Sequence, residues 1–466
     1  MTIQAEAGYT LETYRTVNPA TGEVLRTWEW PTADELEARI ALAHQAFLSW
    51  RMVPIEEKAR VLLRFAELLD DNADALGRQT SIEMGKPLVQ AVGEAHFAAS
   101  IYRYFAQRGA ELLADEVVEV PGIPTTLVCR EPVGIVLGIE PWNAPLFQPM
   151  RVAAPNLMLG NTVLLKPAEI TPGSSVMFDD LFLKAGFPEG AYQTILVSKE
   201  QTSTVIADPR VRAVALTGSD RAGSAVGEQA SRHIKPLVLE LGGSDAFVVL
   251  DRADVPKAAA TAATCRLIIG GQACALPKRV IVTDKVADEF IEHYLPVFTG
   301  QVMGDPLDPE TTLGPMSSDA AADLLQAQYQ DAIDKGATVL LEGGRVAGPG
   351  AYFKPAVITG ITPDMRVYSE EAFGPLGMIY RVPDADAAVT LANESKYGLG
   401  GAVFSEDLAE ARRVARLLDT GGVGVNMFLG SPVEIPFGGT KNSGVGRELG
   451  RSGMDQFANI KTYGIA

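Results

Sequence analysis

Cysteine and histidine are scarce in this sequence, and long apolar runs are missing. Of 466 residues, three are cysteines (Cys129, Cys265 and Cys274), a sparse and odd set that fits a reducing compartment better than a disulfide framework. The four histidines lie far apart without the spacing of metal ligands, so no metal cofactor is expected. No stretch reaches the roughly 18 apolar residues of a membrane span. No basic segment followed by an apolar run opens the chain, which predicts a cytoplasmic protein.

Positive charge is also in short supply. The chain carries 40 Lys and Arg against 58 Asp and Glu, a formal net charge of −18. Nucleic acids and anionic membranes are therefore excluded as partners, because the field of the protein would repel them. Small molecules and other protein subunits remain.

Local patterns indicate an α/β protein. Apolar residues recur at helical spacing over residues 34–50, and several more helices are expected over 56–113, broken near Gly85-Lys86-Pro87. From about Thr125, short apolar runs alternate with helix-like segments, which is typical of parallel strands buried on both faces. The expected strands are residues 133–139, 162–165, 211–216, 236–239 and 247–250.

A second set of strand-like runs predicts a second α/β lobe. It comprises residues 279–282, 338–341, 401–404 and 423–425, and it alternates with helical stretches such as 320–335 and 408–418. Single cores rarely grow beyond roughly 250–300 residues, so this chain should divide into two or three lobes. No repeat or long linker occurs, and the lobes should be joined by short connections.

Three motifs carry candidate chemistry. Cys274 ends Gly270-Gly-Gln-Ala-Cys274, where small neighbours allow a substrate to approach a nucleophilic thiolate, although a lone cysteine is more often a small core residue. Glu240 stands at the end of an apolar strand before Leu-Gly-Gly243, a position that suits a reactive carboxylate but equally a capping or salt-bridging residue. Asn143, in Glu140-Pro-Trp-Asn-Ala-Pro145, can donate to an oxyanion or can simply form the turn.

These three segments, in this order, resemble the aldehyde dehydrogenase family. The resemblance covers nearly the whole chain, from Asn18-Pro-Ala-Thr-Gly22 to the last expected strand. Further family-like stretches are Lys166-Pro-Ala-Glu169, Ala185-Gly-Phe-Pro-Glu-Gly190, Leu216-Thr-Gly-Ser219 with Gly223, Glu371-Ala-Phe-Gly-Pro375, Asn393-Glu with Tyr397-Gly-Leu399, and Pro436-Phe-Gly-Gly-Thr-Lys-Asn-Ser-Gly444.

The resemblance implies a reaction and an architecture. Cys274 would be the nucleophile, Asn143 and the Cys274 N–H the oxyanion hole, and Glu240 the general base that hydrolyses a thioester. A Rossmann-like cofactor domain (1–111 and 130–240), an α/β catalytic domain (241–452) and a small β oligomerisation element (112–129 and 453–466) would follow, in a homodimer or homotetramer. A coenzyme A-acylating enzyme is disfavoured by Glu240, and a catalytically silent binding protein by the joint presence of Cys274, Glu240, Asn143 and Lys166.

The cofactor implied is NAD or NADP. Lys166 and Glu169 should lie near the adenosine ribose, where a carboxylate favours NAD by repelling a 2′-phosphate, unless Glu169 only pairs with Lys166 or caps a helix. The remaining residues implied in cofactor binding lie in four of the segments above: Trp142, Gly218, Ser219, Gly223, Leu241, Glu371 and Phe373. Without the resemblance, Phe373 would be read equally well as a core residue.

The substrate is the more open question. Arg151, eight residues after Asn143, resembles the arginine of the succinic semialdehyde dehydrogenase branch, with Ser431 as a second donor, and this implies a carboxylate-bearing aldehyde. A structural role for Arg151, paired with an acidic residue, is the alternative. Ile268, Ile269 and Ala144 depart from the family pattern and predict a wider, more apolar pocket, which leaves neutral aliphatic or aromatic aldehydes open.

Overall fold

Helices dominate residues 33–112, as the apolar spacing predicts. The computed structural model describes residues 13–466, so residues 1–12, assigned above to the cofactor domain, lie outside the described part. The first helix begins at a capping box in which Thr32 and Glu35 bond reciprocally to each other's backbone. The predicted break near Gly85 is confirmed: this residue ends a helix with φ 84°, and Pro87 precedes the next. The four helices are α1 (Ala33–Trp50), α2 (Ile55–Asp71), α3 (Ala73–Met84) and α4 (Leu88–Leu112).

The first lobe is built on a six-stranded sheet in the order β21-β9-β8-β5-β6-β7. Its members are β5 (Ile135–Ile139), β6 (Thr162–Lys166), β7 (Tyr192–Thr194), β8 (Val211–Thr217), β9 (Leu237–Glu240) and β21 (Gly444–Val445). All pairs are parallel except β21 with β9. The chain runs from β5 outward to β7 and then returns to β8 on the other side of β5. The strand order thus reverses between β5 and β8, which is where open α/β sheets bind ligands.

Four helices connect these strands: α5 (Gln148–Leu159), α6 (Pro172–Ala185), α7 (Lys199–Ala207) and α8 (Asp220–Arg232). The apolar side chains of the lobe form cores on the two faces of the sheet. Every residue of α5 is buried, because this helix lies between the sheet and the helices α2 and α4.

The second lobe contains a seven-stranded sheet in the order β12-β15-β16-β11-β10-β18-β19. Its strands are β10 (Asp245–Val249), β11 (Pro277–Thr283), β12 (Thr338–Leu341), β15 (Ala356–Thr359), β16 (Leu376–Val382), β18 (Gly400–Phe404) and β19 (Gly422–Val425). Helices cover both faces of this sheet: α9 (Val255–Arg266), α10 (Ala287–Thr299), α11 (Asp319–Asp334), α12 (Arg366–Ser369), α13 (Ala385–Asn393) and α14 (Leu408–Leu417). The sequence indicated the second sheet but not its strands β15 and β16, and it grouped β10 with the strands of the first set.

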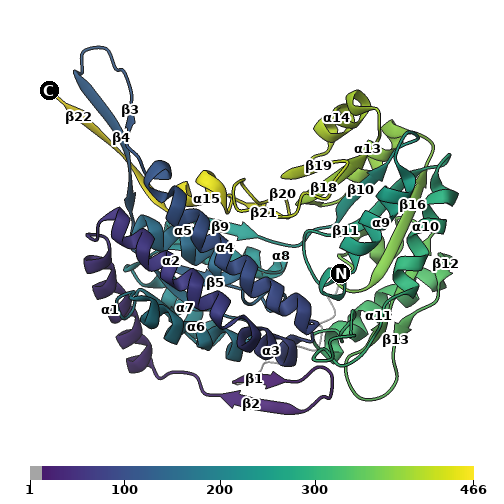
Figure 1. The fold of residues 1–466 in the computed structure, drawn as a ribbon, viewed down its shortest axis with the longest axis horizontal. Coiled ribbons are helices and arrows are strands. Elements are labelled where there is room, and N and C mark those ends of the chain that lie inside the picture. The colour runs from purple at the N-terminus through teal and green to yellow at the C-terminus, as the bar shows by residue number, and fades with distance from the viewer. Residues whose placement is uncertain (1–12) are drawn as a thin grey trace.

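A narrow β arm projects from the first lobe, at the upper left of Figure 1. It consists of β3 (Glu116–Val117), β4 (Thr125–Pro132) and the C-terminal β22 (Ala458–Ile465). β4 pairs with β22 along eight residues of antiparallel register and with β3 on its other side. The outer edge of β22 therefore has no partner strand within residues 13–466.

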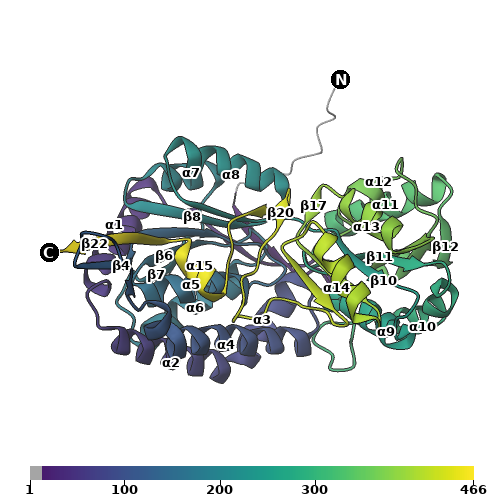
Figure 2. The same ribbon diagram turned by 90° about the horizontal axis from the view of Figure 1, so that it is seen from above.

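After β19 the chain returns to the first lobe, as its yellow segment shows in Figure 2. Val433, Leu449 and Met454 join the core of the first lobe, and α15 (Gly450–Asp455) contacts α5. The domain boundaries given above remain a proposal, and this return indicates that residues after about 430 bridge the two lobes. Within residues 13–466, no helix combines the length and apolar character needed to cross a membrane.

Short elements complete the fold. They are β1 (Tyr14–Val17) paired with β2 (Val24–Trp28), β13 (Gly344–Arg345) with β14 (Phe353–Lys354), β17 (Tyr397–Gly398) with β20 (Thr440–Lys441), and the 3-10 turn η1 (Ile268–Gly271).

Candidate active site

The loop that carries Cys274 is held in a strained conformation. Three consecutive residues of η1 have left-handed backbone angles: Ile269 (φ 52°), Gly270 (φ 58°) and Gly271 (φ 77°). Glycine adopts this region freely, whereas a β-branched isoleucine does so only at a cost in energy. The N–H of Ile269 donates to Oε1 of Gln90 at 2.9 Å, which helps to hold the strained residue.

A fully buried arginine ties this loop to the second lobe. Arg266 donates from Nε to the carbonyl of Leu376 (3.0 Å), from Nη1 to Gly271 (3.1 Å) and from Nη2 to Ala372 (2.8 Å). Its burial lowers the pKa of the guanidinium to about 10. The segment around Ala372 is therefore fixed against the start of the Cys274 loop.

Asn143 reaches the same loop from the first lobe. Its Nδ2 donates to the carbonyl of Gln272 at 3.0 Å, and its Oδ1 accepts from Nε2 of Gln148 at 3.2 Å. The side chain of Gln272 in turn accepts at Oε1 from the N–H of Ser317 (3.0 Å). The amide of Asn143 is thus bonded to Gln272, two residues before Cys274, and Gln148 helps to hold it in place.

Cys274, Asn143, Arg151 and Ser431 line one cavity of about 860 Å³. Four separate parts of the chain supply these side chains, which were singled out from the sequence. Most of the other walls are apolar or aromatic, and they include Phe97, Phe147, Leu267, Ile268, Phe428 and Phe437. The more apolar pocket expected from Ile268 and Ile269 agrees with this lining.

The Cys274 thiol has a raised pKa. Burial is the largest effect and raises the pKa of Cys274 to about 11. The cations Lys278 and Arg151 oppose this rise in the pKa of the thiol, and the carboxylates Glu371 and Glu240 add to it. The thiol therefore depends on surrounding charge to become a nucleophile.

Three buried carboxyl groups gather around Arg151. Glu240 ends β9, Glu140 follows β5, and Glu448 lies in the returning segment, and each is at most 4% exposed. Burial raises the pKa of all three, and the pKa of Glu140 and Glu240 rises further through repulsion by Glu448, while Arg151 lowers it. Burial and mutual repulsion thus both favour the neutral forms of these carboxyl groups, and Arg151 opposes this effect.

Arg151 has its closest ionic partner within the protein. Its Nε lies 2.6 Å from Oε2 of Glu448, and its Nη2 donates to Oγ1 of Thr217 at 3.2 Å. The guanidinium is stacked near the rings of Phe147 (5.3 Å) and Phe437 (5.0 Å). The structure thus places Arg151 on the cavity wall and gives it an acidic partner as well, so it fits both of the roles weighed from the sequence.

The residues assigned to cofactor binding lie at the carboxyl ends of the strands of the first sheet. Lys166 ends β6, and its Nζ bonds Oε1 of Glu169 at 2.8 Å. Ser219 caps α8, directly after β8, by accepting from the N–H of Ala222. A Cβ on Gly223 would lie 2.6 Å from the end of the Leu241 side chain, so a larger residue there would displace Leu241. This edge, with a helix N-terminus after β8, fits a dinucleotide.

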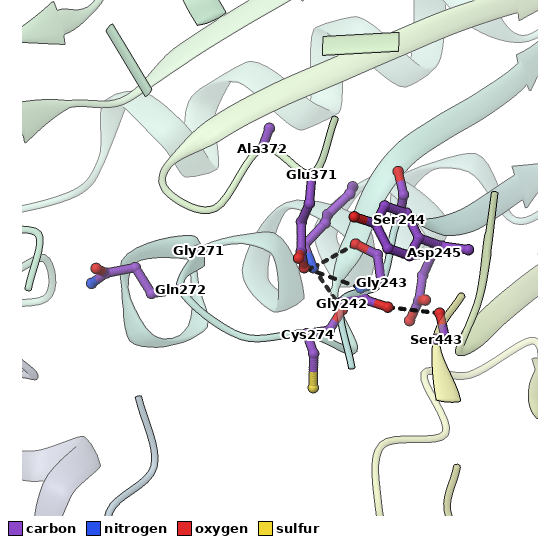
Figure 3. Close-up of polar contacts among 12 residues, drawn as sticks. Gly242, Gly243, Ser244, Asp245, Gly271, Gln272, Cys274, Glu371, Ala372 and Ser443 are labelled. Atoms are coloured by element: carbon purple, nitrogen blue, oxygen red, sulfur yellow. Dashed lines mark hydrogen bonds and ion pairs between the residues drawn. The ribbon is translucent and has the colours of Figure 1, made fainter. Parts of the chain in front are cut away.

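Glu371 and Phe373 join this edge from the second lobe. Oε1 of Glu371 accepts from the N–H of Gly243 at 3.2 Å (Figure 3) and forms an ion pair with Lys278. The ring of Phe373 meets that of Trp142 edge-on, with centroids 5.7 Å apart. The two lobes therefore contact each other through residues assigned to the cofactor.

Sequence reasoning missed three charged residues of the site. Glu140 belongs to the motif around Asn143, and Glu448 follows the last family-like stretch. Lys278 is the second residue of strand β11. Lys278 lies one residue before the expected strand 279–282, and an ionisable residue next to an apolar strand was the one local signal available. The pairing of Arg151 with Glu448 joins residues almost three hundred positions apart and leaves no such signal.

Comparison with known proteins identifies the family. The model of the aldehyde dehydrogenase family matches residues 6–463. The chain is 50% identical over 448 residues to the succinate-semialdehyde dehydrogenase (NADP(+)) of Deinococcus radiodurans, covering 96% of this chain and 94% of the relative. It is 42% identical over 453 residues to succinate-semialdehyde dehydrogenase (NADP(+)) 1 of Mycobacterium ulcerans, covering 97% and 99%.

A solved structure agrees with these relatives. Succinic semialdehyde dehydrogenase from Streptococcus pyogenes, in complex with NADP+, superimposes with a TM-score of 0.94 at 39% identity, covering 97% of this chain and 99% of that one. The chain belongs to the aldehyde dehydrogenase family. It is an oxidoreductase that acts on aldehydes and depends on a nicotinamide cofactor, and the predicted fold is confirmed.

Proposed function

We propose that this enzyme oxidises a carboxylate-bearing aldehyde, succinic semialdehyde being the leading candidate, to the carboxylic acid through a thioester on Cys274. The observation that carries the proposal is that Arg151 and Cys274 line the same cavity. A guanidinium can bind the carboxylate of the substrate in two-point contact while the aldehyde meets the thiol. The names of the relatives from Deinococcus radiodurans and Mycobacterium ulcerans support this substrate.

The proposed reaction has two halves. The Cys274 thiolate adds to the aldehyde carbon and gives a thiohemiacetal oxyanion, which the Asn143 amide and the Cys274 N–H stabilise. A bound nicotinamide supplies the acceptor for the hydride that leaves this carbon. The resulting thioester is attacked by water, and release of the acid returns the sulfur of Cys274.

Glu240 is the proposed general base of the second half. Burial raises its pKa well above the ordinary range, so its ionised form is a stronger base toward water than an exposed carboxylate. Neither of its oxygens has a hydrogen-bond partner within residues 13–466, which leaves both available to a water molecule. Repulsion by the neighbouring Glu448 and Glu140 contributes to the rise in the pKa of Glu240.

A second candidate substrate class is favoured by the cavity itself. The hydrogen bond to Thr217 already uses one donor of the Arg151 guanidinium, the ion pair with Glu448 already balances its charge, and the cavity walls are mainly apolar. Neutral aliphatic or aromatic aldehydes would bind such a cavity by burying apolar surface. Ser431, which also borders the cavity, would then have no carboxylate to bind.

The cofactor is proposed to be held by Lys166, Glu169, Gly218, Ser219 and Glu371 at the edge of the first sheet. The preference for NAD expected from Glu169 is not supported by the relatives, whose names specify NADP(+). The ion pair with Lys166 partly cancels the charge of Glu169 and so weakens its repulsion of a 2′-phosphate. We therefore propose that NADP is accepted as well as NAD.

A homodimer or homotetramer is proposed from the β arm. The outer edge of β22 lacks a partner strand, and Ile460 and Ile465 on it are exposed. Such an edge is a template for pairing with another chain. A cytoplasmic location, expected from the sequence, likewise stays a proposal.

Turnover of a small aldehyde panel tests the function. Formation of reduced cofactor is followed by absorbance with succinic semialdehyde, butanal and benzaldehyde, each with NAD and with NADP. We expect succinic semialdehyde to have the highest kcat/KM, and Arg151→Met to raise its KM at least about tenfold while leaving that of butanal little changed. A higher kcat/KM for butanal or benzaldehyde would favour the second candidate and assign Arg151 a structural role.

A further inference from the structure

A lysine is completely buried behind the nucleophile. The side chain of Lys278, at the start of β11, has 0% exposure. Its Nζ donates to the carbonyl of Cys274 at 2.6 Å and to the carbonyl of Gly243 at 2.9 Å, and it forms an ion pair with Glu371. All donors of this ammonium group are used by three segments that meet at the site.

This arrangement joins the nucleophile to the turn that follows Glu240. Gly243 belongs to that turn, and a Cβ on it would lie 2.6 Å from the carbonyl oxygen of Cys274, so the two backbones are in close contact. In Figure 3, the side chain of Cys274 points away from the cluster formed by Glu371 and Gly243. The ammonium group thus binds the Cys274 peptide from behind and leaves the sulfur facing the cavity.

We propose that Lys278 is the positioning residue of the nucleophile: it fixes the Cys274 peptide against Gly243 and supplies the buried cation that favours the thiolate. This inference rests on the proposed function, in which Cys274 reacts with the aldehyde. A buried cation acts strongly on a nearby thiol because little water screens it. Lys278 is the largest of the charge effects that lower the pKa of Cys274, ahead of Arg151.

Glu371 carries the negative charge that pairs with Lys278. Its carboxylate pairs with Lys278 and raises the pKa of Cys274, as does Glu240. The charged groups that act on the thiol therefore come from four segments: Lys278 of β11, Arg151 of α5, Glu371 of the segment after α12, and Glu240 of β9. Removing the positive or the negative member of the Lys278–Glu371 pair should move the reactivity of the thiol in opposite directions.

The test measures the rate at which iodoacetamide alkylates Cys274 in the full-length protein as pH is varied, without cofactor or aldehyde. Below its pKa the thiolate fraction changes tenfold for each pH unit, so the rate reports the ionisation of the sulfur. We expect Lys278→Met to slow alkylation at about pH 8 by at least about tenfold. Lys278→Arg, which keeps the charge, should recover part of the rate.

Glu371→Gln is the matched variant of opposite sign. It has the same size and keeps an amide that can accept from Gly243, yet it leaves Lys278 without its counter-charge, so we expect alkylation to become several-fold faster. If the two substitutions acted only by loosening the loop, the rate of alkylation would change in the same direction in both variants. Circular dichroism and thermal unfolding show whether each variant is folded.

The outcomes separate this inference from the proposed function. Peptide mass mapping identifies which cysteine is alkylated. If Cys274 is labelled and its alkylation rate depends on pH in the same way in wild type, Lys278→Met and Glu371→Gln, the role of Lys278 alone is overturned. A label absent from Cys274 and present on Cys129 or Cys265 would overturn both proposals.

Discussion

Arg151 and Glu448 form an ion pair of 2.6 Å at the wall of the cavity, and their side chains are only 2% and 4% exposed. Arg151 comes from α5 of the first lobe, and Glu448 comes from the segment that returns from the second lobe. A substrate carboxylate that approaches Arg151 must therefore compete with a carboxylate that the protein already provides. This competition sets the first prediction.

Glu448→Gln should strengthen the binding of an anionic aldehyde. Removing the negative charge leaves the Arg151 guanidinium free to bind a substrate carboxylate, so the KM for succinic semialdehyde should fall by about tenfold while the KM for butanal stays the same. Stability should fall by less than the roughly 3–5 kcal/mol typical of breaking a buried pair, because Glu140 and Glu240 remain close to Arg151. An equal change of KM for both aldehydes would contradict substrate binding by Arg151.

Glu240→Gln should separate the two halves of the reaction. Acylation of Cys274 needs no base at Glu240. The variant should therefore form about one molecule of reduced cofactor per active site in a rapid initial burst. Steady turnover should then drop by about 10²–10⁴-fold, because the thioester waits for an activated water. Stopped-flow absorbance measures the burst, and Cys274→Ala, which should show neither burst nor turnover, is the control. A variant that lost the burst as well would show that Glu240 acts before the thioester forms.

Ile269→Asn should stabilise the protein. Asparagine tolerates a positive φ better than a β-branched residue, so the substitution relieves strain at φ 52° and should raise the free energy of unfolding by about 0.5–1 kcal/mol. Thermal unfolding measures the change. Ile268→Asn, at the neighbouring residue of η1, which is not among those with positive φ, is the matched control and should bring no gain. Equal effects of both substitutions would mean that backbone strain is not the cause.

The sequence predicted most strands of the two sheets and the residues at their ends, for a physical reason. Helical spacing and short apolar runs are local patterns, and the carboxyl ends of parallel strands share one edge, so Asn143, Lys166, Ser219 and Glu240 could be expected together. Contacts between distant segments leave no local pattern. The pair of Arg151 with Glu448 and the bonds of Lys278 depend on how the returning segment and the second lobe dock, and they became visible only in three dimensions.

Glu169→Gln should shift the cofactor preference toward NADP. The substitution removes the carboxylate that repels a 2′-phosphate and frees Lys166 from its ion pair. We expect the ratio of kcat/KM with NADP to kcat/KM with NAD to rise by about tenfold, which corresponds to about 1.4 kcal/mol. Lys166→Met is the control and should weaken both cofactors. An unchanged ratio would assign Glu169 no part in cofactor choice.

Asp179→Asn should stabilise the protein above about pH 6 and lose this advantage in acid. Asp179 of α6 accepts from the N–H of Thr194 at 2.9 Å, and burial raises its pKa from 3.8 to about 6. A raised folded-state pKa means that the stability contribution of Asp179 is complete below about pH 4 and disappears as the pH rises through 6.

Asparagine has no such charge to bury, and its amide oxygen can still accept the Thr194 bond. At about pH 7.5 the variant should therefore exceed wild type by about 2 kcal/mol, allowing for partial solvent screening, and the difference should shrink toward about pH 4.5. Urea unfolding at the two pH values measures it. Asp180→Asn, at a neighbour whose side chain is 77% exposed, is the matched control and should show no pH-dependent gain. If both variants respond to pH alike, the buried carboxyl of Asp179 is not the source of the effect.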